Sequence, residues 1–216
     1  MPRPLLLGHR GLRLSGEPAE NTIAAFDRAL ELGCDGFEFD VRLTADRQLV
    51  ICHDPRHAGC ELATVPYGQV AQLPLLQDVL ARFAGRAFLD IELKVAGMEE
   101  SVLAALAGHP PERGFMLSSF LPSILQELQS LNGHLPLGFI SDRESVLAHW
   151  RDLPVECVVP HFSLLTRELM DEAHQSGRKL MVWTVNNTDE MRRFSDWGVD
   201  GIISDDPGLL VHTIQR

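Results

Sequence analysis

The chain has 216 residues, of which 45% are hydrophobic, and its formal net charge is −11 at pH 7 with histidine neutral. This length supplies one sizeable hydrophobic core and is short for two domains, so we expect a single domain over residues 1–216. The negative charge argues against nucleic acid or an anionic membrane surface as a partner, and favours a small-molecule substrate.

Short apolar runs alternate along the chain with amphipathic stretches, which predicts strands and helices in turn. The predicted strands cover residues 5–8, 36–41, 88–93, 115–119, 137–140, 156–160, 180–185 and 201–204. The predicted helices cover residues 22–32, 75–83, 98–107, 122–131, 143–149, 166–175 and 189–197. Asn21 is expected to cap the first helix and Gly33 to end it.

The predicted strands, such as FLDIEL and GIISD, are mainly apolar runs rather than clean alternations of apolar and polar residues. Such runs are typical of parallel strands that are covered on both faces. Eight strands with helices between them predict an α/β fold, a (β/α)8 TIM barrel that is distorted by a short hairpin and insertion after the second strand. An open doubly wound sheet is the structural alternative.

The hairpin is predicted from a connection that is too short for a crossover helix. Only residues 42–48 separate the second strand from the apolar run LVICH, and Ala45-Asp46-Arg47 favours a turn. Antiparallel pairing about this turn sets His53 opposite Phe39 and Asp40. The following residues 55–74 have little periodicity and are expected to form an irregular insertion over the barrel mouth.

Carboxylates recur at two-residue spacing near the ends of two predicted strands. Glu38 and Asp40 project to one face of their strand, and Glu92 and Lys94 share a face of theirs. Buried ionised carboxylates are costly unless they are paired or bind a cation, and Mg2+ or Ca2+ suits oxygen ligands. The alternative is structural ion pairing of Glu38 with Arg10 or Arg42, and of Glu92 with Lys94. Barrel enzymes place their active sites at these strand ends, which favours the metal.

Two histidines, His9 and His53, fall at further strand ends beside charged neighbours, Arg10 and Asp54. Imidazole titrates near neutrality, so such a pair can supply one general acid and one general base. Arg10 can form a bidentate contact with phosphoryl oxygens, and Lys94 adds a point charge. Phosphate chemistry is the reaction class that these residues predict.

The four cysteines show no CxxC spacing or regular framework, and no apolar run approaches the ~20 residues of a membrane span. We therefore expect reduced thiols, a cytoplasmic location and no stable membrane association.

Several motifs, in order along nearly the whole chain, resemble those of the glycerophosphodiester phosphodiesterase family. They are HRG at 9–11, ENT at 20–22, EFDV at 38–41, HDP at 53–55, IELK at 91–94, SSF at 118–120, WTVN at 183–186 and GVDGIISDDP at 198–207. This ordered set is far more specific than any one motif. Two departures are a shortened insertion, HAGCELATVPYGQVAQL, and Ala19 in place of the usual proline before ENT.

The resemblance implies a distorted TIM barrel of the phospholipase-C-like type and hydrolysis of a glycerophosphodiester to an alcohol and sn-glycerol 3-phosphate. It also implies one divalent metal ion, Mg2+ or Ca2+. The implied roles are acid and base for His9 and His53, metal ligands for Glu38, Asp40 and Glu92, substrate or phosphate binding for Arg10, Lys94, Trp183 and Phe120, and supporting positions for Glu20 and Asp205. The attacking group is either the glycerol 2-hydroxyl, which gives a cyclic phosphodiester, or water.

Two other functions remain open from the sequence. A lysophospholipase-D-like enzyme would act on larger lipid substrates, because the short insertion leaves more room at the mouth. A catalytically silent barrel would bind phosphorylated ligands, although binding alone does not require an acid/base pair.

Overall fold

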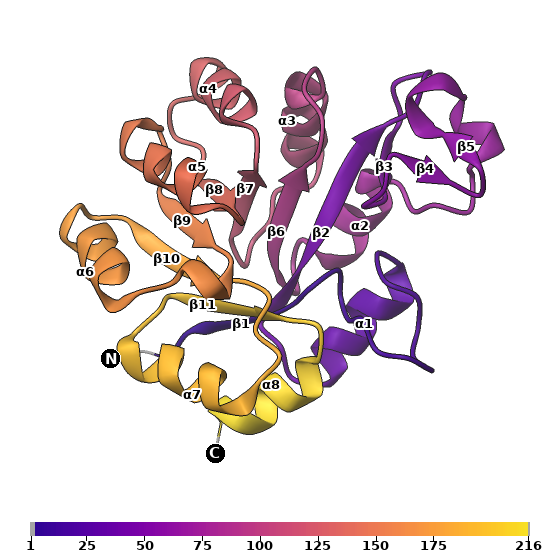
Figure 1. The fold of residues 1–216 in the computed structure, drawn as a ribbon. Coiled ribbons are helices and arrows are strands. Elements are labelled where there is room, and N and C mark those ends of the chain that lie inside the picture. Colours follow the sequence, from indigo (N-terminus) through magenta and orange to yellow (C-terminus); the bar gives the residue numbers. More distant parts are fainter. Residues whose placement is uncertain (1–2, 216) are drawn as a thin grey trace.

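The computed structural model describes residues 3–215, and its centre is a ring of parallel strands (Figure 1). The ring strands are β1 (Leu5–Gly8), β2 (Gly36–Leu43), β6 (Phe88–Leu93), β7 (Phe115–Ser119), β8 (Leu137–Ser141), β9 (Cys157–Pro160), β10 (Lys179–Val182) and β11 (Gly201–Ser204). β1 pairs in parallel with both β11 and β2, so the first strand closes the ring. The chain is therefore a (β/α)8 barrel, and the open sheet is excluded.

Helices cover the outside of the ring. They are α1 (Ile23–Glu31), α2 (Leu76–Phe83), α3 (Glu99–Gly108), α4 (Pro122–Leu131), α5 (Glu144–Leu147), α6 (Arg167–Gln175), α7 (Thr188–Trp197) and α8 (Pro207–Ile214). Among the described residues, no helix has both the length and the hydropathy that crossing a membrane would require.

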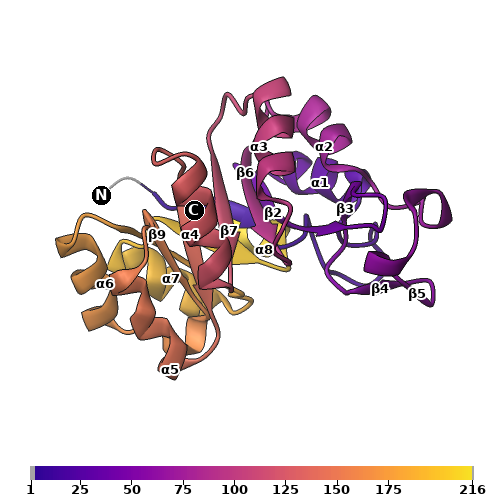
Figure 2. The same cartoon turned by 90° about the horizontal axis from the view of Figure 1, so that it is seen from above.

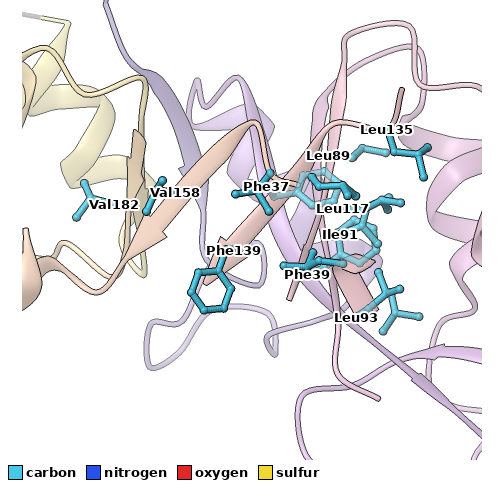
Figure 3. Close-up of a cluster of buried hydrophobic side chains, with 14 of the residues drawn as sticks. Phe37, Phe39, Leu89, Ile91, Leu93, Leu117, Leu135, Phe139, Val158 and Val182 are labelled. Atoms are coloured by element: carbon cyan, nitrogen blue, oxygen red, sulfur yellow. The ribbon is translucent and has the colours of Figure 1, made fainter. Parts of the chain in front are cut away.

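The side chains of each barrel strand alternate between the outer core and the barrel interior. On β2, Phe37 and Phe39 join the large apolar cluster between strands and helices. The Phe37 ring stacks there on the Phe26 ring of α1, with the ring centroids 4.3 Å apart. Leu89 and Ile91 of β6 extend the same cluster (Figure 3). Burying each of these side chains contributes about 1.5–3 kcal/mol. The residues between them, such as Glu38, are left to face the interior.

The hairpin after β2 has the predicted antiparallel form. β3 (Leu49–Ile51) pairs with β2 in the register Val41↔Ile51, and the Cys52 backbone N–H donates to the Asp40 carbonyl at 3.0 Å. Continuing this register brings His53 to Phe39, so the hairpin carries a histidine to the strand that holds the carboxylates.

The insertion does not lie over the pocket described below, contrary to expectation. It contains β4 (Arg56–His57), β5 (Cys60–Glu61) and two 3-10 turns, η1 (Leu62–Thr64) and η2 (Tyr67–Gln69). Its apolar residues, such as Leu62 and Val70, pack against Val50 of β3 in a separate small cluster. It therefore sits beside the barrel (Figure 2), and none of its described residues lines that pocket.

Some predicted boundaries are wrong. Thr22 rather than Asn21 caps α1, because the Thr22 side chain accepts from the Ala25 N–H at 3.2 Å. The predicted strand 180–185 ends at Val182. The predicted helix 143–149 is only one turn, α5, followed by a 3-10 segment that buries Trp150.

The helix α8 was not predicted, although its start was readable in the sequence. The side chain of Asp206 accepts from the Leu209 N–H at 2.8 Å, and Pro207 occupies the first turn. An N-cap aspartate followed by proline is a typical helix start.

Candidate active site

A pocket of about 210 Å3 lies at the carboxyl ends of the strands, and its lining is polar on one side and mainly apolar on the other. Its polar half is lined by His9, Arg10, Glu38, His53, Asp90, Glu92 and Lys94. Its other half is mainly apolar and is lined by Phe120, Ile140, Asp142, Val159, Trp183 and Ile203. A larger cavity of about 420 Å3 opens among the strand starts, near Leu5 and Lys179, and holds none of the predicted site residues. The chemistry therefore belongs to the smaller pocket.

Three carboxylates meet at the polar half. Glu38, Asp40 and Glu92 each offer an oxygen within 4.8 Å of the others, because β2 and β6 pair with Asp40 opposite Glu92. All three side chains are buried, and Glu38 Oε1 and Asp40 Oδ1 have no hydrogen-bond partner in residues 3–215. Unpaired buried oxygens are costly, and hard oxygen donors favour a hard cation. The cluster therefore fits a divalent metal ion.

Two cations already contact the same carboxylates. Lys94 Nζ lies 2.6 Å from Glu92 Oε1 and 3.3 Å from Asp40 Oδ1. Arg10 Nε lies 3.2 Å from Asp40 Oδ2, and the Arg10 backbone N–H donates to Glu38 Oε2 at 3.0 Å. Of the ion pairs offered as an alternative to the metal, the pair of Glu92 with Lys94 is present. Among the described residues, Glu38 forms no ion pair with Arg10 or Arg42, and its Oε1 has no hydrogen-bond partner.

Burial raises the pKa of two members of the cluster. Burial raises the pKa of Glu92 to about 8, with the charge on Asp40 adding to the shift. Burial also raises the pKa of Glu38 well above its usual value. Burial alone would raise the pKa of Asp40, but Lys94 and Arg10 hold it below its usual value. A metal ion that binds all three as carboxylates therefore has to displace a proton from Glu92 near neutral pH.

His9 follows β1 directly, and its side chain is buried. Its Nδ1 lies 2.7 Å from Asp205 Oδ1, and its Nε2 lies 3.8 Å from Glu38 Oε2. A carboxylate at Nδ1 keeps a proton there and leaves Nε2 facing the carboxylate cluster. Burial would raise the pKa of Asp205, but hydrogen bonds from His9 and Asn186 hold it below its usual value. Asp205 is therefore an anion at neutral pH.

His53 has a similar arrangement on a more exposed side chain. Its Nδ1 lies 2.7 Å from Asp54 Oδ1, and Arg42 Nε donates to its carbonyl at 2.7 Å. Burial lowers the pKa of His53, although the charge on Asp40 opposes the shift. A neutral imidazole at pH 7 is able to accept a proton.

The apolar half contains two aromatic rings from residues that directly follow β7 and β10. Phe120 and Trp183 meet edge to face, with ring centroids 5.5 Å apart. The Trp183 indole N–H donates to the Val159 carbonyl at 3.1 Å, which fixes the ring. The pair forms a firm apolar wall across from the charged residues.

Glu20 and Asp205 stand behind the pocket wall and hold residues that line it. Glu20 Oε1 accepts from Arg10 at 2.6 Å, and its other oxygen accepts from Arg13. Burial would raise the pKa of Glu20, but these two arginines hold it below its usual value. Asp205 likewise holds His9, as described above. The predicted site residues therefore all lie at this end of the barrel.

Two further polar residues join the site although the sequence pattern did not single them out for it. Asp90 lines the pocket, accepts from Ser118 Oγ at 2.6 Å through Oδ1, and has no partner at Oδ2 among the described residues. The signal was available, because Asp90 lies two residues before Glu92 on the same strand. Asn21, expected as a helix cap, instead donates to Asp40 Oδ2 at 2.8 Å.

Asp90→Asn is expected to change how stability depends on pH. Burial raises the pKa of Asp90 to about 7, from about 3.9 in an unfolded chain. The stability linked to its protonation is present below about pH 4 and is lost as pH rises through about 7. Asparagine keeps an acceptor for Ser118 and cannot ionise. Between pH 4 and 8 the wild type should therefore lose roughly 2–4 kcal/mol more unfolding free energy than the variant. Urea unfolding in chelator measures this, and parallel pH curves would contradict it.

Comparison with known proteins gives one consistent result. The model of the "Glycerophosphoryl diester phosphodiesterase family" matches residues 9–60 and 57–209. A glycerophosphodiester phosphodiesterase of Caldanaerobacter subterraneus is 31% identical, over 99% of each chain. A glycerophosphodiester phosphodiesterase structure from Parabacteroides distasonis has a TM-score of 0.87 at 24% identity, covering 99% of this chain and 97% of that one. An Oleispira antarctica phosphodiesterase, solved with the product sn-glycerol-3-phosphate, has a TM-score of 0.86 at 22% identity, covering 99% and 98%.

Proposed function

This chain belongs to the glycerophosphoryl diester phosphodiesterase family, and from that premise we propose that it hydrolyses glycerophosphodiesters to an alcohol and sn-glycerol 3-phosphate. The observation that carries the proposal is the convergence of two imidazoles, two cations and three carboxylates on one small pocket. A pocket built only to bind a phosphorylated ligand would not need two histidines, each paired with an aspartate.

Arg10 and Lys94 hold the phosphoryl group of the substrate. Both line the pocket beside the carboxylate cluster, and Arg10 is oriented by Glu20 from behind. Their positive charges bind the phosphate in the ground state. They also stabilise the extra negative charge that develops on the phosphoryl oxygens as the phosphorus is attacked. When bound by Glu38, Asp40 and Glu92, a divalent ion, Mg2+ or Ca2+, supplies further neutralisation of that charge.

His9 and His53 move the protons. One imidazole takes the proton from the attacking hydroxyl, and the other gives a proton to the leaving alkoxide as the bond between phosphorus and the alcohol oxygen breaks. Each ring has its Nδ1 beside an aspartate, so each has Nε2 available for this exchange. We assign the roles of general acid and general base to the two histidines as a pair, without giving either role to one of them. The attacking hydroxyl belongs to water or to the glycerol C2 carbon. In the second route the alcohol leaves with formation of a cyclic glycerophosphate, and water then breaks the bond between phosphorus and the C2 oxygen to give sn-glycerol 3-phosphate, so a transient cyclic product identifies this route.

The size of the pocket bears on the substrate. At about 210 Å3 it is smaller than the roughly 300 Å3 at the low end of pockets for drug-sized ligands. It fits the glycerophosphate portion, with the glycerol beside Trp183 and Phe120 and the alcohol toward the rim. The substrate class is therefore small glycerophosphodiesters, rather than the lysophospholipids of the alternative function.

Incubation with glycerophosphocholine and a divalent metal is expected to release choline and sn-glycerol 3-phosphate in equal amounts. Enzymatic detection of both products measures this, and lysophosphatidylcholine under the same conditions should turn over much more slowly. Release of phosphocholine instead would place the cut on the other side of the phosphorus. Faster release of choline from lysophosphatidylcholine would favour the lipid alternative.

Two broader expectations accompany the activity. All four cysteines are free, and three are buried, which supports a reducing, cytoplasmic location. We also propose that the chain acts as one domain, since the barrel takes its first strand from Leu5–Gly8 and its last helix from Pro207–Ile214.

A further inference from the structure

Asn186 lies four residues beyond the end of β10, outside the pocket wall, and its side chain is directed at Asp205. We propose that Asn186 is a positioning residue that fixes the Asp205 carboxylate and, through it, the His9 imidazole. The activity part of this inference rests on the proposed function, whereas its structural part does not.

The Asn186 amide makes three hydrogen bonds that define its orientation. Its Nδ2 donates to Asp205 Oδ2 at 2.7 Å. Its Oδ1 accepts from the Asp205 backbone N–H at 3.0 Å and from Ser204 Oγ at 3.0 Å. A flipped amide would turn its NH2 group toward a backbone donor, so only one orientation satisfies the contacts. Asn186 therefore holds Asp205 by both its backbone and its side chain.

This arrangement divides the two carboxylate oxygens of Asp205. Asn186 occupies Oδ2, and Oδ1 is left for His9 Nδ1 at 2.7 Å. Arg13 is a competitor, because its guanidinium lies 3.5 Å from the same Oδ1. Without Asn186, the half-exposed Arg13 and water can draw the carboxylate away from the imidazole. The amide thus keeps the aspartate on His9, and Nε2 of His9 directed to the cluster.

The test compares Asn186→Ala with Asn187→Ala, its immediate neighbour. Asn187 caps α7 by accepting from the N–H groups of Asp189 and Glu190, so its loss weakens a helix without touching Asp205. We expect Asn186→Ala to lower kcat for glycerophosphocholine about 10–100-fold, with KM changed less than about threefold. Asn187→Ala should leave kcat within about twofold of wild type.

A second variant, Asn186→Asp, keeps the shape of the side chain and its acceptor oxygen. It replaces the Nδ2 donor with a carboxylate oxygen that faces Asp205, so like charges meet and kcat should fall at least as far as in Asn186→Ala. Wild-type kcat in both Asn186 variants would overturn the proposal. An equal loss in Asn187→Ala, or a loss confined to KM, would also overturn it.

A readout that needs no turnover is the NMR signal of the proton between His9 Nδ1 and Asp205, assigned by its loss in His9→Gln. We expect this signal in wild type and in Asn187→Ala, and we expect it to broaden or disappear in Asn186→Ala. If the wild type hydrolyses no glycerophosphodiester, the proposed function fails while this measurement still decides the role of Asn186. An unchanged signal in Asn186→Ala would contradict the positioning role of Asn186.

Discussion

His9→Ala and His53→Ala are each expected to lower kcat for glycerophosphocholine by about 10²–10⁴-fold. Both rings line the pocket, and each has an aspartate at Nδ1 that leaves Nε2 available for proton transfer. Because general acid and general base act in one turnover, losing either leaves the other with little to assist. The double variant should therefore be about as slow as the slower single variant, rather than showing the product of the two losses.

The matched control is His134→Ala, at an exposed histidine between α4 and β8 that is absent from the pocket wall. Its kcat should stay within about twofold of wild type. Each variant should also be checked for binding of sn-glycerol 3-phosphate, since intact binding with lost turnover separates proton transfer from folding. Activity within a few-fold of wild type in either His9→Ala or His53→Ala would remove that residue from the mechanism.

The barrel was predictable because its signals are local. Strand runs such as FLDIEL are set by burial on both faces, and the two-residue repeat correctly put Glu38 and Asp40 on one face. The same repeat puts Asp90 on the face of Glu92, although Asp90 lies outside the IELK motif. The hairpin that brings His53 to β2 followed from a connection too short for a helix.

The contacts that complete the site were not predictable, because they join distant segments. Asp205 meets His9 across 196 residues of sequence, through the pairing of β1 with β11. Asn21 was expected to serve its own helix, yet its φ of 57° turns its side chain toward Asp40 instead. The predicted position of the insertion, over the barrel mouth, was wrong for a related reason. Its apolar residues found partners on β3, and nothing in the local sequence states which surface they cover.

Metal removal is expected to lower the rate at least about 10²-fold, because a Lewis acid at this position contributes several kcal/mol to charge neutralisation. The residue-level counterpart is Glu92→Gln, which keeps the size of the side chain and removes one anionic ligand from the cluster. It should weaken metal binding at least about 10–100-fold, because losing a residue that only supports a ligand already costs that much, and it should leave the variant active only at high metal concentration. Asp152→Asn, at an exposed acid away from the pocket, is the control and should bind metal like wild type.

The raised pKa values in the cluster also predict how metal affinity depends on pH. Exposed carboxylates with ordinary pKa values are already ionised at pH 6 and would not show this dependence. Burial raises the pKa of Glu92 to about 8, so a proton occupies this ligand position at pH 7, and burial also raises the pKa of Glu38 well above its usual value. Metal affinity should therefore rise with pH up to about 8 and then level off, with protons released on binding. Calorimetry in two buffers of different ionisation enthalpy counts those protons, and Glu92→Gln should release fewer. An affinity that is flat between pH 6 and 8 would contradict the protonated state of the cluster. A rate that survives thorough chelation would mean that the three carboxylates serve to hold Lys94 and Arg10 rather than a metal ion.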